Sequence, residues 1–362
     1  MLDELEFSRV PDGGASSPAL GPLLTQFHSV KRGDAAPRWV REGIQRAWGL
    51  PPSTQVALIV LSENVTFRVE FEGQSRLVVR FGRPGYAAGT EHIRSELVWV
   101  EALRSGAGIP TPSPVRGADG DWVQTIIDPN GAIWTAVSFE FIEGTILEEQ
   151  PEFTQHYEEI GALTAALHRH ASSWTPPASF TRFAWDVSDM VGTHARWGHW
   201  GNARMPAPDR GLLQRAENRA KDVLAEAEVS KSPQHFGLIH GDLRPSNVMT
   251  HDDSLAIIDF DDCGYGYYLY DFAAALTFYE HRPEASGMAA AWLDGYRSVL
   301  PLSDRELGVA AAFSMLRRLT MLGWSTTHSP DALPTDLWNE NLPGTVEVAA
   351  KFLADPRWIV RN

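Results

Sequence analysis

Three oxygen-bearing side chains, Asp242, Asn247 and Asp259, lie on the successive segments "LIHGDLRPSNVM" and "LAIIDFDDCGYG". In each segment an apolar run leads into a polar turn, which is typical of a strand end that positions side chains. Mg²⁺ prefers carboxylate and amide oxygens and leaves its other positions to water and phosphate, and Asn247 and Asp259 are of this kind. Asp242 lies on the tight turn before them and can accept a proton from a substrate hydroxyl. The two segments together predict a magnesium site beside a general base.

Each segment taken alone has a plainer interpretation. His-Gly-Asp is a common turn, and Asp-x-Asp-Asp can be an ordinary loop or an incidental cation site. The combination is more specific, because Asn247 follows Asp242 by five residues and Asp259 follows Asn247 by twelve, after a strand-rich half of the chain. His240 is interpreted as a brace for the loop, and Cys263 as a small residue without a chemical role.

The elements that must position these residues fall into two groups. Runs of β-branched residues predict consecutive antiparallel strands in residues 54–73 and 75–82, and further strands in residues 121–128 and 132–144. Helices are predicted around residues 38–50 and over residues 89–108, the second capped by Thr90 and carrying an apolar stripe of Ile93, Leu97, Val100 and Leu103.

From residue 152 onward the pattern is mostly helical. Helices are predicted in residues 157–174, 210–228 and 302–322, and Ser303 and Glu306 form a capping box at the start of the last one. This order predicts an α+β, bilobal architecture. We expect a flexible arm over residues 1–36, which is rich in Gly, Pro and Ser at residues 11–22, a strand-rich N-lobe over residues 37–142 and a helical C-lobe over residues 143–362.

Composition narrows the functional classes. The 362 residues are 43% hydrophobic and 21% charged, which is ordinary for a folded protein, and no run of eighteen apolar residues indicates a membrane span. The single cysteine excludes an internal disulfide, and the acidic start lacks the apolar region of a signal peptide, so a cytoplasmic location is expected. A net charge of −15 argues against a nucleic-acid partner and is compatible with cationic small substrates or simply with solubility.

The combined pattern resembles the aminoglycoside phosphotransferase and choline kinase superfamily, which shares the protein-kinase fold. Its catalytic loop reads H-G-D-x-x-x-x-N and is followed by a strand-borne Asp, as it is here. The stretches "LIVLSENVTFRVE", "LVVRFGRPGY" and "IRSELVWVEAL" are similar to those of the branch that holds type II homoserine kinases and the stress-response kinase A group. The resemblance covers most of residues 40–300.

The resemblance implies a role for each matching residue. Asp242 matches the catalytic base, Asn247 and Asp259 match the Mg²⁺ ligands, and Asp261 is expected close to the metal. Arg80 takes the place of the phosphate-holding Lys, and Glu96 matches the helix Glu that pairs with it. The adenine would meet the linker between the lobes at Phe139, Glu140 and Phe141.

Two departures from the family pattern shape these expectations. No Gly-rich loop precedes the second strand, so "SENVTF" would cover the phosphates, with Asn64 as the contact. Arg replaces Lys at position 80. The planar guanidinium of Arg, with its several N–H donors, is not equivalent to the compact charge of a Lys ammonium group. The alternative is that Arg80 is a surface strand residue, and Arg68 is then the next candidate for the phosphates.

The implied activity is ATP- and Mg²⁺-dependent phosphoryl transfer to a hydroxyl of a small molecule: an amino alcohol, a hydroxy amino acid or an aminoglycoside-like antibiotic. Alternatives are a protein serine/threonine kinase of the stress-response type and a nucleotide-sensing protein without turnover. Trp185, Trp197 and Trp200 fall where the superfamily builds its acceptor site, and packing is the favoured interpretation for them. The acceptor, the choice between ATP and GTP, and the oligomeric state stay open.

Overall fold

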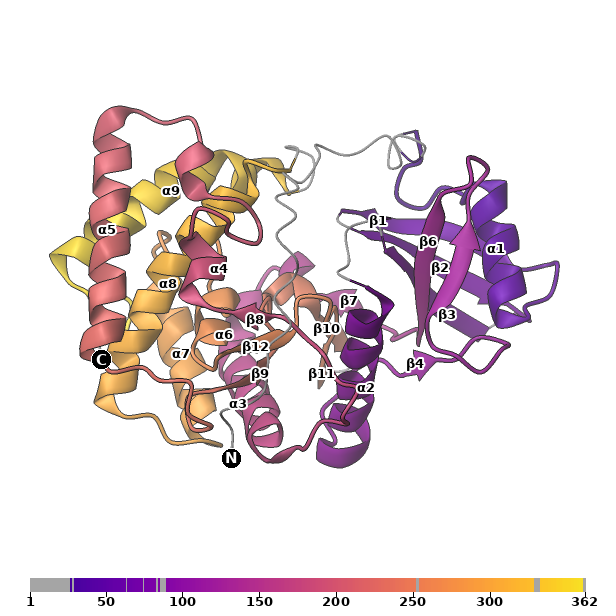
Figure 1. The fold of residues 1–362 in the computed structure, drawn as a ribbon, viewed down its shortest axis with the longest axis horizontal. Coiled ribbons are helices and arrows are strands. Elements are labelled where there is room, and N and C mark those ends of the chain that lie inside the picture. Colours follow the sequence, from indigo (N-terminus) through magenta and orange to yellow (C-terminus); the bar gives the residue numbers. More distant parts are fainter. Residues whose placement is uncertain are drawn as a thin grey trace. The chain divides into compact units, whose positions relative to one another are not determined.

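The computed structural model describes residues 27, 29–62, 64–73, 75–82, 84, 89–251, 254–328 and 333–360. These residues form two compact units (Figure 1). The N-terminal unit contains the described residues up to Glu143 together with Pro176–Thr181. The C-terminal unit contains Gly144–Thr175 and the described residues from Arg182 onward.

An antiparallel sheet is the frame of the N-terminal unit, and among the described residues it has six strands in the order β1-β2-β3-β6-β4, with β5 also paired to β6. Their bounds are β1 (Gln55–Leu61), β2 (Asn64–Phe71), β3 (Ser75–Gly82), β4 (Pro114–Val115), β5 (Gln124–Ile127) and β6 (Ile133–Glu140). Alternate residues of β2, namely Val65, Phe67 and Val69, are fully buried, as expected for a strand with one face on a core. The predicted consecutive antiparallel strands are confirmed.

Two helices accompany this sheet, α1 (Arg38–Trp48) and α2 (Thr90–Ala107). The predicted apolar stripe of α2 is confirmed, because all four of its residues are buried. The prediction that Thr90 caps α2 is wrong. Thr90 is the first helical residue, and Gly89, with a φ of 143°, occupies the cap position without a side-chain hydrogen bond. That backbone angle favours glycine, so the chain enters the helix by a turn rather than through a hydroxyl cap.

The described part of residues 1–36 corrects the prediction of a flexible arm for that range. Phe27 is fully buried in the aromatic core of the N-terminal unit. The amide of Ala36 donates to the carbonyl of Val56 at 2.8 Å, and the amide of Leu58 donates to the carbonyl of Asp34 at 3.0 Å. An apolar side chain and strand-like hydrogen bonds thus fix this stretch on β1. The Gly- and Pro-rich part of the predicted arm, residues 11–22, lies outside the described residues.

Helices dominate the C-terminal unit. They are α3 (Tyr157–Ser173), α4 (Val187–Val191), α5 (Ala207–Glu226), α6 (Tyr270–Ala275), α7 (Ala285–Arg297), α8 (Asp304–Trp324) and α9 (Thr335–Ala354). The capping box predicted for α8 is present, with Ser303 and Glu306 bonding reciprocally. In the described part of the chain, no helix combines the length and the apolar character that a membrane crossing requires.

Two small sheets in the C-terminal unit place the segments that carry the predicted chemistry. Their orders are β11-β10-β7 and β8-β12-β9. Their bounds are β7 (Thr145–Ile146), β8 (Ala184–Trp185), β9 (Phe236–Ile239), β10 (Val248–His251), β11 (Ser254–Ile257) and β12 (Gly264–Tyr267). Ile239 pairs with Gly264, and Val248 pairs with Ile257. These two pairings bring residues 240–247 beside residues 258–263.

Candidate active site

The loop between β9 and β10 makes its turn at Gly241, which has a φ of +82°. A Cβ atom at this position would lie 2.7 Å from the carbonyl oxygen of Asp262 and 2.8 Å from the indole nitrogen of Trp185. A side chain is therefore excluded both by the backbone angle and by the lack of space. Glycine lets the chain reverse directly after β9, so that Asp242 follows a buried strand at once.

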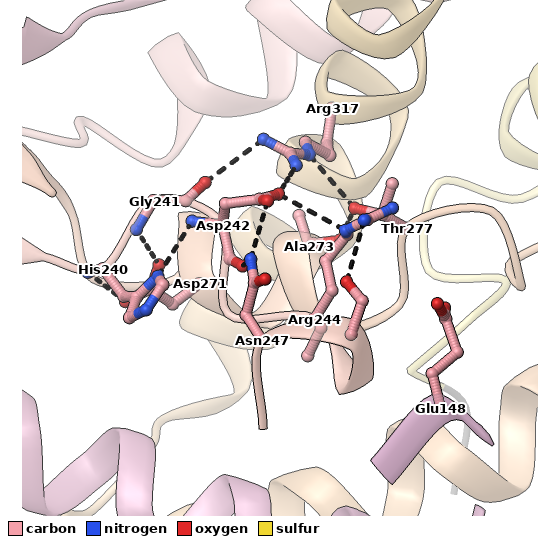
Figure 2. Close-up of polar contacts among 12 residues, drawn as sticks. Glu148, His240, Gly241, Asp242, Arg244, Asn247, Asp271, Ala273, Thr277 and Arg317 are labelled. Atoms are coloured by element: carbon pink, nitrogen blue, oxygen red, sulfur yellow. Dashed lines mark hydrogen bonds and ion pairs between the residues drawn. The ribbon is translucent and has the colours of Figure 1, made fainter. Parts of the chain in front are cut away.

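Asp242 and Asn247 are joined within this loop. The Nδ2 amide of Asn247 donates to the backbone carbonyl of Asp242 at 2.8 Å and to its Oδ2 at 2.9 Å (Figure 2). Both contacts use the NH₂ group, which leaves the Oδ1 oxygen as the acceptor that Asn247 can offer to a cation. One side chain thus orients the carboxylate and presents a hard oxygen ligand beside it.

Two arginines flank the same carboxylate. Arg317, from α8, donates through Nη2 to Asp242 Oδ1, and Arg244 Nε lies 3.6 Å from that oxygen. The side chain of Asp242 is 18% exposed, whereas that of Arg317 is fully buried. The pKa of Arg317 is raised because its contacts with Tyr270 and Asp242 outweigh the effect of burial, which acts in the opposite direction.

A buried carboxylate from α6 holds the backbone of the loop. Asp271 accepts the amide of His240 at 3.0 Å and the amide of Gly241 at 2.8 Å, and His168 Nε2 lies 3.0 Å from its Oδ2. Burial alone would raise the pKa of Asp271, but the His168 contact and the backbone donors lower it overall. His240 Nε2 lies 3.0 Å from the carbonyl of Ile258, which agrees with its interpretation as a brace.

Asp259 and Asp261 lie on the segment that β11 leads into. Asp259 is exposed and has a φ of +62°, a conformation that is uncommon for a residue with a side chain. The amide of Ile258 donates to the carbonyl of Asn247 at 3.0 Å, so the two segments are linked beside both predicted ligands. A strained, exposed carboxylate on a segment that is bonded to the backbone of Asn247 suits Mg²⁺, which takes few protein ligands. In the described ranges no three His, Cys, Asp or Glu side chains gather as a metal site. The roles of Asn247 and Asp259 as metal ligands stay predictions.

The same segment is also fixed through its carbonyl groups. Arg182 donates to the carbonyls of Asp261 and Cys263, both at 2.5 Å, and Trp185 Nε1 donates to the carbonyl of Asp262 at 2.8 Å. The side chain of Cys263 is buried. The backbone after Asp259 is therefore held by three hydrogen bonds from two side chains, Arg182 just before β8 and Trp185 within it.

The tryptophans that the sequence places near an acceptor site are packing residues. Trp185 is fully buried, and Trp197 and Trp200 are 8% and 2% exposed. Trp185 stacks on Tyr270 at 5.7 Å between ring centroids, and the face of Trp197 lies 4.9 Å from the guanidinium of Arg317. The cation beside Trp197 is thus one of the protein's own arginines.

In the N-terminal unit, Arg80 and Glu96 form the predicted pair. Arg80 Nη2, from β3, donates to both carboxylate oxygens of Glu96, from α2, at 2.8 Å. The interpretation of Arg80 as a surface strand residue is wrong, because Arg80 is only 9% exposed. Arg68, the other candidate for the phosphates, is exposed on β2 and lies 3.3 Å from Glu70.

The remaining predicted contacts also lie on this sheet. Asn64 begins β2 and pairs with Gly82 at the end of β3, and its carbonyl accepts the amide of Ser62 at 2.9 Å. Phe139 packs on a small apolar cluster and lies 5.9 Å from the guanidinium carbon of Arg80. Glu140 and Phe141 follow at the end of β6. Their roles toward a nucleotide stay predictions.

Sequence reasoning missed Arg317, Arg244 and Asp271. Arg244 lies inside the motif, two residues after Asp242, and Asp271 lies in the apolar run "LYDFAAAL". Arg317 lies in "AAAFSMLRRLTML", where two arginines interrupt an otherwise apolar helix. Charges in a buried run need partners, and this is the signal that could have indicated contacts for Asp271 and Arg317.

Comparison with known proteins identifies the family to which this chain is related. The model of the phosphotransferase enzyme family matches residues 58–305, which is more than half of the chain. The solved structure of the microcompartment-associated aminopropanol kinase is 31% identical to this chain, covers 88% of this chain and 98% of its own, and has a TM-score of 0.76.

Two further relatives are more distant. The homoserine kinase of Rhodospirillum rubrum is 29% identical over 63% of this chain and 66% of its own length. The solved amicoumacin kinase hAmiN is 21% identical, with a TM-score of 0.68 over 86% of this chain and 92% of its own, and shows the same fold. The H-G-D-x-x-x-x-N loop, the strand-borne Asp after it and the matched family model agree. The chain belongs to the phosphotransferase enzyme family and is a kinase with a bilobal α+β fold.

Proposed function

We propose that this kinase transfers the γ-phosphoryl group of ATP to the hydroxyl of a small molecule that also carries an amine, with Mg²⁺ as its metal. The observation that carries the proposal is the fixed carboxylate of Asp242, partly exposed and hydrogen-bonded to Asn247, an amide that still has an oxygen for a cation. The aminopropanol kinase supports an amino alcohol as the acceptor, because its resemblance spans nearly all of that chain. The homoserine kinase supports a hydroxy amino acid of similar size.

In this proposal Asp242 accepts the proton of the acceptor hydroxyl as its oxygen bonds to the γ-phosphorus, while the bond from that phosphorus to the bridging oxygen breaks and ADP leaves. Asn247 and Asp259 would hold the metal, with Asp261 as a further carboxylate near it. A bound Mg²⁺ neutralises charge on the phosphates. The amicoumacin kinase hAmiN was solved in complex with AMP-PNP and Ca²⁺, a nucleotide analogue with a divalent cation, which supports a metal-bound nucleotide here.

The N-terminal unit supplies the groups that hold the nucleotide. Arg80 binds the phosphates and is itself held by Glu96 at 2.8 Å. Asn64 contacts the phosphates, and Phe139, Glu140 and Phe141 contact the adenine. An acidic chain with a net charge of −15 also attracts a cationic acceptor.

The test is a phosphorylation assay with MgATP or MgGTP and a panel of acceptors: 1-amino-2-propanol, ethanolamine, homoserine and an aminoglycoside, with casein as a protein acceptor. Phosphorus NMR identifies a phosphomonoester product and separates transfer from hydrolysis. We expect transfer to at least one small amino alcohol and none to casein. Label on casein alone supports a protein kinase instead, and nucleotide binding without any turnover supports a sensor.

A further inference from the structure

Arg317 is a charged residue in an apolar environment. It is fully buried in α8, whose flanking residues Phe313, Leu316 and Leu319 are also fully buried. A buried charge is strongly unfavourable unless hydrogen bonds compensate it. The contacts of Arg317 therefore show what the charge is retained for.

All three guanidinium nitrogens of Arg317 have protein partners (Figure 2). Nε donates to Thr277 Oγ1 at 3.0 Å. Nη1 donates to the hydroxyl of Tyr270 at 3.0 Å and to the carbonyl of Gly241 at 3.2 Å, and Nη2 donates to Asp242 Oδ1. Because the side chain is fully buried and engaged in this way, it cannot bind the acceptor itself.

The geometry of these contacts fixes the carboxylate of Asp242. The guanidinium is rigid and planar, so its contacts with the Gly241 carbonyl and Asp242 Oδ1 set the carboxylate relative to its own backbone. Asn247 donates to the other oxygen, Oδ2, at 2.9 Å. With a donor on each oxygen, rotation of the carboxylate about its χ2 bond is opposed from both sides. A base held in this way keeps one orientation toward the incoming hydroxyl.

We propose that Arg317 is the positioning residue of this kinase, which acts through Asp242 and sets the rate of phosphoryl transfer without contacting either substrate. The inference rests on the proposed function, in which Asp242 is the base. It assigns a role in positioning the base to helix α8, which lies largely outside the 58–305 range of the family model.

Arg318 provides a matched control. It is the next residue of α8, is equally buried and donates to Glu280 at 3.4 Å and to the carbonyl of Asn341 at 3.0 Å. Arg317→Met and Arg318→Met each remove one buried charge and keep an unbranched side chain. Arg317 bonds to the loop that carries Asp242, whereas Arg318 bonds to groups outside that loop, so the pair separates positioning from general stability.

The first measurement is steady-state kinetics at saturating nucleotide. We expect Arg317→Met to lower kcat by about 100-fold, the size of effect that a misplacement of about 1 Å produces, with KM for ATP within about twofold of the wild type. Arg318→Met is expected to keep kcat within about threefold even if its melting temperature falls. Arg317→Lys is expected to recover part of the lost kcat, because it keeps the positive charge but not the planar N–H donors of the guanidinium. Equal kcat values in the two Met variants would overturn the proposal.

The second measurement does not need an acceptor, so it tests whether Arg317 fixes the loop of Asp242 even if the proposed transfer is wrong. Hydrogen exchange of a peptide spanning residues 238–249 should be faster in Arg317→Met than in Arg318→Met, since only the former loses the bond to the Gly241 carbonyl. Tyr270→Phe keeps Arg317 and the aromatic ring and removes only the hydroxyl that accepts from Arg317 Nη1. It should give a smaller change in the same direction in both measurements. Equal exchange in Arg317→Met and Arg318→Met contradicts the proposal.

Discussion

The two units each contain a buried arginine–carboxylate pair, and the pairs are arranged in opposite ways. In the N-terminal unit the arginine is the more accessible partner, with side-chain exposures of 10% for Arg80 and 2% for Glu96. In the C-terminal unit the carboxylate is accessible, with 18% for Asp242 and none for Arg317. One pair presents a cation held by a carboxylate, and the other presents a carboxylate held by a cation.

A third pair shows what the arrangement means. Arg318 and Glu280 are both fully buried, so neither partner can reach a substrate. Buried ion pairs contribute little net stability, although removing one partner is strongly destabilising. From this comparison we predict that the more accessible partner of each pair contacts a substrate and that the buried partner orients it. Each of the changes below tests this difference between the pairs.

The largest effect is expected at the accessible carboxylate. Asp242→Asn keeps the shape of the side chain and removes its ability to accept a proton, so kcat should fall by about 1,000-fold, within the range of general base catalysis. Affinity for MgATP should stay close to that of the wild type, because the carboxylate acts on the acceptor. Stopped assays for kcat and calorimetry for nucleotide binding check both parts. Turnover close to that of the wild type would exclude Asp242 as the base.

A second change separates the base from the metal within the same unit. Asp259→Ala should weaken MgATP binding by about 100-fold, since metal contacts to phosphates contribute several kcal/mol. Titration calorimetry with Mg²⁺ and again with EDTA is the measurement. The variant and the wild type should bind equally once the metal is removed, whereas an unchanged affinity with Mg²⁺ argues against Asp259 as a ligand.

A smaller effect is expected from the pair in the N-terminal unit. Arg80→Ala and Glu96→Ala should each raise KM for ATP by about tenfold, the size of one lost charge-assisted hydrogen bond. The double variant should be little worse than the worse single variant, because the residues act as one unit. Arg80→Lys should lie between Arg80→Ala and the wild type.

Arg68→Ala is the matched control for this pair, since Arg68 is an exposed arginine on the neighbouring strand. Its KM for ATP should not change. If the Arg80 and Glu96 variants keep wild-type ATP kinetics while Arg68→Ala does not, the phosphates are held by Arg68.

The smallest effect on activity is expected where both partners are buried. Burial raises the pKa of Glu280 to about 7 from its ordinary value of 4.5. The folded protein thus holds this proton more tightly than the unfolded chain, so the contribution to the free energy of unfolding is full below pH 4.5 and is lost as the pH rises to about 7. Glu280→Gln should flatten this slope in urea unfolding between those pH values, with kcat unchanged. An unaltered slope contradicts the assignment.

Local patterns explain what the sequence could predict. Residues 240–247 and 258–263 each form a short stretch whose spacing is fixed by one turn, so Asp242, Asn247 and Asp259 could be found together. The strands and the α2 stripe followed from alternation and helical periodicity because one face of each packs on a core. Arg80 and Glu96 are sixteen residues apart, and the family pattern was needed to join them.

Contacts between distant residues explain what could not be predicted. Arg317 meets Asp242 across 75 residues, and His168 meets Asp271 across 103. No spacing rule relates such positions, since their proximity depends on how whole helices pack. The prediction of Thr90 as the cap of α2 failed for a different reason. Thr90 is a suitable cap by residue type, but Gly89 provides the backbone angle that begins the helix.

The buried thiol of Cys263 is a natural probe for opening of the segment that surrounds it. It is the single cysteine of the chain, and its carbonyl is held by Arg182 in the segment that follows Asp259 and Asp261. A thiol reagent can reach a buried thiol only when the surrounding structure opens, so the rate of labelling under native conditions measures how often the segment around Cys263 opens. The rate at which Cys263 reacts with a chromogenic disulfide therefore measures opening of this segment without an engineered label. Slower labelling in MgATP than in buffer would show that the bound nucleotide makes opening less frequent.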